Sequence, residues 1–159
     1  MLYLQLLIVL IAANGAPILG RLLFRVHWKV PIDLGAIFID GRQWLGPSKT
    51  YRGVVFGVVT AGLFAEVMAL PFEIGLLVGA LAMCGDAVSS FVKRRLGLQS
   101  GAMALGLDQI PESAIPLIGV KALYGLSWSE IGLMVGAFLM VELVLSRLLF
   151  TFQIRKHPW

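Results

Sequence analysis

Four long runs of apolar residues constrain this chain more than any other feature of its sequence. They extend from Leu2 to Phe24, from Val54 to Leu70, from Phe72 to Val92 and from Ile131 to Phe152. A helix of about 20 residues crosses the ~30 Å hydrocarbon core of a bilayer, so each run is long enough to span it with modest tilt. Hydrophobic residues make up 58% of the chain and charged residues only 14%, which is unlike a typical water-soluble domain. We therefore predict an all-α integral membrane protein with one domain over residues 1–159.

A fifth apolar segment, Ile110 to Leu126, contains Pro111, Pro116 and Lys121, and we expect a short or broken helix there. The prediction is a polytopic bundle of about five transmembrane helices. Basic residues gather in a first loop over residues 25–53, in a second loop over residues 93–112 and at the C-terminus. They are Arg25, Lys29, Arg42, Lys49, Arg52, Lys93, Arg94, Arg95, Arg155 and Lys156.

The positive-inside rule places both of these loops and the C-terminus in the cytoplasm and the N-terminus outside. An odd number of crossings agrees with that orientation. The chain is thus expected to be a multi-pass protein of the cell membrane, in contact with membrane lipids and with its polar site facing the cytoplasm. The net charge of +4 follows from these loops, so no nucleic-acid partner is needed to explain it.

A polar stripe is predicted on the third long helix. Asp86, Ser89 or Ser90, and Lys93 recur at helical spacing and lead from the membrane toward the cytoplasmic surface. An ionisable residue inside a membrane span is a functional-site hypothesis, because a buried carboxylate is costly unless it is paired, protonated or bound to a cation. Two structural alternatives stay open: Asp86 pairs with a basic residue, and the cluster from Lys93 to Arg95 serves as a topology anchor or an anionic-lipid contact.

The second loop contains glycines at Gly97 and Gly101 and then Asp108-Gln109. Glycines allow tight turns and close approach to a ligand, so the loop with its basic neighbours is a candidate phosphate cradle. Its spacing matches neither a Walker loop nor a dinucleotide-binding fingerprint. If the loop folds back, Asp86 and Asp108 would hold Mg²⁺ against a triphosphate. The alternative for Asp108 is a helix cap.

The first loop interleaves charged residues with glycines and hydroxyl groups, which suits an anionic phosphorylated ligand at the membrane surface. The candidates are Asp40, Arg42, Lys49, Thr50 and Arg52. Lys49, Thr50 and Arg52 come at the start of the second long helix, whose dipole also favours phosphate. The alternative is an ordinary basic loop with turns.

The remaining polar residues give weaker signals. His27 and His157 have no metal-ligand spacing, so a zinc site is not expected. Asn14 and Pro17 interrupt the first helix and are most simply a kink, and Glu142 and Arg147 are expected to pair with other helices.

Three stretches, taken together and in order, resemble the CDP-archaeol synthase family, a branch of the phosphatidate cytidylyltransferase-like membrane enzymes. The matching residues are Ala13-Asn14 with Pro17, Asp40-Gly41-Arg42, Leu45-Gly46, Lys49-Thr50-Tyr51-Arg52-Gly53, Gly85-Asp86, Ser90-Phe91, Lys93-Arg94-Arg95, Gly97, Gly101 and Asp108-Gln109. The resemblance implies a five-helix enzyme that uses CTP, a lipid phosphate and Mg²⁺ to make a CDP-activated lipid and pyrophosphate. The family pattern has a further aspartate three positions after Asp108, where this chain has Pro111 followed by Glu112.

These features together predict an in-line displacement at the α-phosphorus of CTP by the lipid phosphate. Asp86 and Asp108 would bind Mg²⁺, with Lys93 as a further catalytic residue. The residues expected to bind the triphosphate and the lipid phosphate, or to shape the nucleotide site, are Asp40, Arg42, Lys49, Thr50, Arg52, Ser90, Arg94 and Arg95.

Two other functions stay open at this point. One is the same chemistry on a diacyl phosphatidate. The other is a non-enzymatic transporter or lipid-binding subunit, in which Asp86, Glu142 and Lys121 would form a path for an ion or a substrate. The sequence does not decide between the lipids, and it does not give the oligomeric state.

Overall fold

The computed structural model describes residues 1–23 and 29–151. In these two ranges six helices follow one another: α1 (Leu2–Leu23), α2 (Tyr51–Val67), α3 (Phe72–Arg95), α4 (Gln109–Gly119), α5 (Lys121–Tyr124) and α6 (Trp128–Thr151). Within the described residues the extended pairings are two isolated bridges in the first loop, Pro31 with Thr50 and Ile37 with Gln43. The prediction of an all-α chain is therefore confirmed.

The helix ends agree with the predicted spans apart from small shifts. α2 begins at Tyr51 because Thr50 is its N-cap and accepts a hydrogen bond from the Gly53 N–H at 3.2 Å. The fifth segment is broken as predicted, since α4 ends at Gly119 and the short α5 follows Val120. Among the described residues, α3 and α6 are long and apolar enough to cross a membrane, and α1 contributes the shorter apolar stretch Leu2–Ile18.

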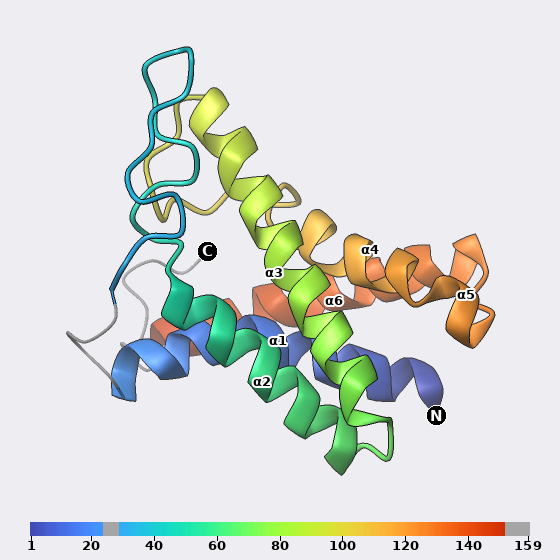
Figure 1. Cartoon of the computed structure of the whole chain (residues 1–159). Coiled ribbons are helices and arrows are strands. Elements are labelled where there is room, and N and C mark those ends of the chain that lie inside the picture. The colour runs from blue at the N-terminus through green and yellow to red at the C-terminus, as the bar shows by residue number, and fades with distance from the viewer. Residues whose placement is uncertain (24–28, 152–159) are drawn as a thin grey trace.

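The helices pack in sequence, α1 on α2, α2 on α3 and α3 on α4, while α6 closes the bundle against α4 and α1 (Figure 1). Small residues bring α2 and α3 close together. A Cβ atom at Gly75 would lie 2.5 Å from the Ala61 carbonyl oxygen, and one at Gly79 would lie 2.7 Å from the Ala61 Cβ. Such close backbone approach is the usual way for helices to associate in lipid.

α3 ends in a turn that sends the chain back toward the helix. Gly97 has φ +78°, and the N–H groups of Gly97 and Leu98 donate to the carbonyls of Arg94 and Lys93 at 3.1 and 3.0 Å. This is the Schellman arrangement, which favours glycine because an L side chain is strained at positive φ. The second loop consequently returns along the end of α3, beside the first loop (Figure 1).

Asp33 fixes the fold of the first loop. Its carboxylate accepts hydrogen bonds from the N–H groups of Gly35, Leu45 and Gly46 at 2.9 to 3.1 Å. Partial burial pushes the pKa of Asp33 upward, but the three backbone donors outweigh it and hold that pKa below its ordinary value. The first loop thus has a defined fold and lies over the end of α3.

Candidate active site

The polar stripe predicted on α3 is present and largely covered. Ser89, Ser90, Lys93 and Arg94 are buried, and the Asp86 side chain is 21% exposed. Ser89 donates to the Asp86 carbonyl at 2.9 Å, which ties its hydroxyl into the helix. The Ser90 hydroxyl is 1% exposed and has no hydrogen-bond partner among the described residues. Buried polar groups are normally satisfied, so this hydroxyl is available to a ligand or a water.

Lys49 connects the first loop to α3. Its Nζ lies 2.5 Å from Oδ1 of Asp86, and both side chains are about one-fifth exposed at 19% and 21%. The expected alternative for Asp86, a pairing with a basic residue, is therefore what the structure contains. The contact also brings one predicted phosphate-binding residue to the predicted metal ligand.

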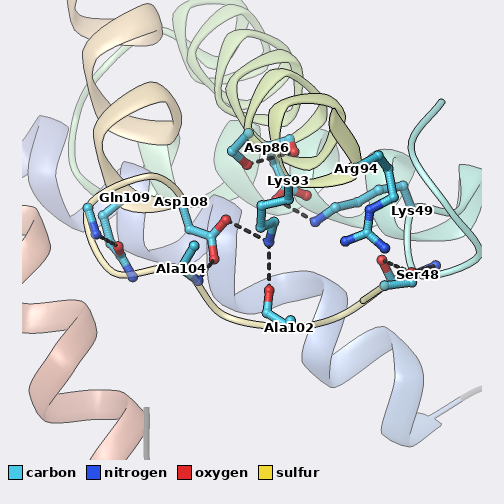
Figure 2. A network of polar contacts seen from close by, with 12 residues as sticks. Ser48, Lys49, Asp86, Lys93, Arg94, Ala102, Ala104, Asp108 and Gln109 are labelled. Carbon is cyan, nitrogen blue, oxygen red and sulfur yellow. Dashed lines mark hydrogen bonds and ion pairs between the residues drawn. The ribbon is translucent and has the colours of Figure 1, made fainter. Parts of the chain in front are cut away.

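Lys93 connects α3 to the second loop (Figure 2). Its Nζ lies 2.7 Å from Oδ1 of Asp108 and donates to the Ala102 carbonyl at 2.9 Å, while Oδ2 of Asp108 accepts from the Ala104 N–H at 3.0 Å. Arg94 donates to the Gln99 carbonyl at 2.6 Å. The loop therefore does fold back as expected, and its backbone is held by cations of α3.

Asp86 and Asp108 pair with different lysines: Asp86 with Lys49 of the first loop, and Asp108 with Lys93 of α3. Asp108 contacts Lys93, whose Cα lies two turns or about 10 Å along the helix axis from that of Asp86. Within residues 1–23 and 29–151, no cluster of three or more His, Cys, Asp or Glu side chains could hold a metal ion. The joint Mg²⁺ site of Asp86 and Asp108 stays a prediction.

Glu112 is the carboxylate that lies against Asp86. It is 8% exposed, and its carboxyl group is within hydrogen-bonding contact of the Asp86 side chain. Gly85 makes the contact possible, because a Cβ there would meet the Pro111 carbonyl oxygen at 2.2 Å and the Glu112 Cα at 2.8 Å. Mg²⁺ is usually held in proteins by one or two carboxylates together with substrate phosphates and water. The pair of Asp86 and Glu112 fits that requirement.

The first loop is attached to the end of α3 by contacts among Asp40, Arg42 and Arg95. Arg42 donates to the carbonyls of Arg94 and Arg95 at 3.1 and 2.7 Å, where a cation also complements the helix dipole. Arg95 pairs with Asp40 at 2.6 Å and stacks over the rings of Phe38 and Phe91. Three residues expected near the nucleotide thus contact one another and the protein backbone.

A cavity of about 360 Å³ lies between the first loop, α1, α2 and α3. Its polar lining includes Lys29, Lys49, Arg52 and Asp86, and its apolar lining includes Pro17 and Met83. Thr50 also lines it, while its hydroxyl caps α2. A cavity lined by both cations and apolar side chains suits an anionic group carried by an apolar molecule.

The first and second loops contact each other through two serines. The Ser100 hydroxyl donates to that of Ser48 at 3.0 Å and accepts from the Ser48 N–H at 3.3 Å. Gly46 leaves room for this contact, since a Cβ there would lie 2.8 Å from Oγ of Ser100. Ser48, which also lines the cavity, therefore joins the first loop to Ser100 of the second loop.

Two residues of the site were not assigned from the sequence. Glu112 was noted only as a shift in the family pattern, and Lys29 only as a basic loop residue; their positions depend on tertiary contacts that local spacing does not encode. The basic residues Arg25, Arg155 and Lys156, with His27 and His157, lie outside the described residues.

Comparison with known families matches residues 2–159 to a family model described as CarS-like, CDP-archaeol synthase. A protein named CDP-archaeol synthase from Hyperthermus butylicus is 42% identical over 106 residues, which is 63% of this chain and 60% of that protein. One from Pyrobaculum aerophilum is 35% identical over 103 residues, covering 62% and 61%. The alignments thus span about 60% of the length of these two relatives.

Longer matches exist as well. The CDP-archaeol synthase of Sulfurisphaera tokodaii is 33% identical over 137 residues, or 81% of each chain. A solved structure described as an intramembrane enzyme for archaeal membrane lipids biosynthesis superimposes with a TM-score of 0.76 at 26% identity. That superposition covers 89% of this chain and 90% of the other.

Proposed function

The chain belongs to the CDP-archaeol synthase family, and from this we propose that it is a membrane-embedded CTP:lipid-phosphate cytidylyltransferase. The lipid is an archaeal-type ether lipid phosphate. An oxygen of that phosphate bonds to the α-phosphorus of CTP, the bond from this phosphorus to the β-phosphate oxygen breaks, and pyrophosphate leaves. The products are a CDP-activated lipid and pyrophosphate. The relatives' name and the description of the solved structure support this reaction.

One observation carries the proposal: a cavity that combines cations with apolar side chains opens beside the carboxylate pair of Asp86 and Glu112. Lys29, Lys49 and Arg52 supply positive charge to the cavity, and Asp86 lies at its α3 wall. A lipid phosphate requires both cationic and apolar lining residues, because its head is anionic and its tail is apolar. We assign the lipid phosphate to this cavity.

We assign the triphosphate of CTP to the neighbouring face of α3 under the second loop. Lys93 and Arg94 are buried cations there, and the Ser90 hydroxyl is buried without a hydrogen-bond partner in the described part of the chain. Both substrates then meet at Asp86. A phosphate nucleophile is already ionised near neutral pH, so positioning and charge neutralisation suffice and no general base is required.

We further propose that Asp86 and Glu112 hold Mg²⁺, with the predicted ligand Asp108 reaching it only after release from Lys93. When bound, Mg²⁺ would neutralise and orient the triphosphate. The protein residues do the rest: Lys49 and Arg52 orient the lipid phosphate, and Lys93 and Arg94 stabilise the charge that develops on the leaving pyrophosphate.

The proposed topology has about five crossings, with α4 and α5 counted as one broken span. The N-terminus lies outside, and the two loops with the C-terminus lie in the cytoplasm. The loop contacts between Ser48 and Ser100 support a shared side for both loops. That side is also where CTP is available.

The test is a turnover assay with purified protein in nanodiscs. Labelled CTP, Mg²⁺ and either an isoprenoid ether lipid phosphate or a diacyl phosphatidate are supplied, and lipid-linked label is measured. We expect label with the ether lipid; label with diacyl phosphatidate alone would replace the proposed lipid. Absence of a CDP-lipid from every arm, with protein that retains its fold, would refute the activity.

A further inference from the structure

The carboxyl groups of Asp86 and Glu112 touch in a mostly buried setting, which calls for a positive charge or a proton between them. Lys49 supplies such a charge, with its Nζ 2.5 Å from Asp86. It also contributes to the electrostatic surroundings of Glu112, as does Glu142 of α6. Lys49 is therefore the counter-ion of a carboxylate pair that we have assigned to Mg²⁺.

Lys49 has its backbone fixed and its side chain at the edge of a cavity. Its carbonyl accepts from the Ile32 N–H at 2.9 Å, and its N–H donates to the Gly46 carbonyl at 3.3 Å. The side chain also lines the cavity that contains Lys29 and Arg52. Rotation about side-chain bonds alone can thus move the ammonium group from Asp86 into the cavity.

Lys93 is held differently, although it also pairs with an aspartate. Its side chain is 6% exposed, and its Nζ is shared between Asp108 and the Ala102 carbonyl. Asp108 in turn accepts from the Ala104 backbone. This second pair is tied into the loop at both ends and must open before Asp108 can leave Lys93, so the first exchange, at Asp86, is assigned to Lys49.

We propose that Lys49 is an exchangeable counter-ion. It neutralises Asp86 and Glu112 in the substrate-free protein, and it moves to phosphate oxygens in the cavity when a divalent cation takes the two carboxylates. The inference rests on the proposed function. Its consequence is that cation and phosphate substrate bind together, because either one alone leaves charges without partners. Such coupling is reciprocal and typically amounts to 5–150-fold.

The test is Mn²⁺ binding, measured by electron paramagnetic resonance, to nucleotide-free protein in nanodiscs of uncharged lipid. Removing the resident cation in Lys49→Met should tighten Mn²⁺ binding by about tenfold. Lys49→Arg keeps a cation and should stay near the wild type. Lys121→Met is the matched control, since Lys121 lies on α5 over the Trp128 ring, away from the site. In an Asp86→Asn background, Lys49→Met should give no tightening.

Unchanged or weaker Mn²⁺ binding in folded Lys49→Met protein would overturn the exchange. That result combined with weaker binding of the lipid phosphate would leave Lys49 as a simple phosphate ligand. The cytidylyltransferase proposal is judged separately by whether wild-type protein makes a CDP-lipid. Where Lys49→Met does not fold, Lys49→Gln replaces it in the same titration. A Lys49 variant is taken as folded when its denaturation midpoint equals that of Lys121→Met.

Discussion

Replacing Gly85 with alanine should separate α4 from α3 and disturb the carboxylate pair. The added Cβ would lie 2.2 Å from the Pro111 carbonyl oxygen and 2.8 Å from the Glu112 Cα, both backbone atoms that no side-chain rotation can move away. Real Cβ atoms essentially never approach closer than 3.0 Å, so this part of α4 must retreat by about 0.8 Å.

The magnitude follows from two opposing effects. Alanine is favoured over glycine in a helix by about 1 kcal/mol. Overpacking a tight contact costs about 1–3 kcal/mol, and here the clash is with backbone. We therefore expect a net loss of up to about 2 kcal/mol in the free energy of unfolding. A displacement near 1 Å in a catalytic arrangement can also lower turnover by ~100-fold.

The matched control is Gly136→Ala on α6, where a Cβ meets nothing within 4 Å. That variant should gain about 0.5–1 kcal/mol from helix propensity and keep full turnover. Denaturant unfolding in micelles and the CTP turnover assay measure both effects. If Gly85→Ala proved as stable and as active as Gly136→Ala, the close packing of α3 on α4 and the role of Glu112 would both be wrong.

Three further predictions concern the loops. Arg42→Gln should cost about 1–2 kcal/mol of stability by removing a charged cap from α3, and limited proteolysis should then cut the first loop faster than in the wild type. The pKa of Asp33 is lowered in the folded protein, so its carboxylate should stabilise the first loop fully above the ordinary pKa of about 3.9. This stabilisation should be lost as the pH falls through the folded pKa. Hydrogen exchange at the loop amides measures the effect, with Asp33→Asn as a pH-insensitive reference. Ser48→Cys and Ser100→Cys, each in a Cys84→Ala background, should react with an impermeant thiol reagent from the same side of the membrane, and labelling from opposite sides would contradict the proposed topology.

Much of the fold could be predicted because long apolar helices are recognisable in a sequence from their length and apolarity. A broken helix in the fifth segment was predicted from its prolines, although both prolines lie within α4 and the break comes after Gly119. The polar face of α3 was predicted from the helical spacing of Asp86 and Lys93. These features are local. They depend on residues within a few turns of one another.

The partners of the polar residues could not be predicted in the same way. Arg42 and Arg95 bind loop and helix carbonyls, a use of a guanidinium group that composition cannot distinguish from phosphate binding. Glu112 reaches Asp86 only because Gly85 lets two helices approach, which is a contact between separate elements. A cluster of charges therefore marks the site, while the tertiary packing decides which charge meets which.

The reaction proposed for this chain transfers the α-phosphate of CTP, with its nucleoside, to a lipid phosphate. The most direct measurement compares CTP labelled at the α-phosphate with CTP labelled at the γ-phosphate, using wild-type protein and Asp86→Asn in nanodiscs with Mg²⁺ and an isoprenoid ether lipid phosphate. We predict that only the α-label enters the lipid, that the γ-label appears as pyrophosphate in equal amount, and that folded Asp86→Asn gives neither product. Lipid labelled from the γ-phosphate, or near wild-type turnover by Asp86→Asn across a Mg²⁺ titration, would contradict it.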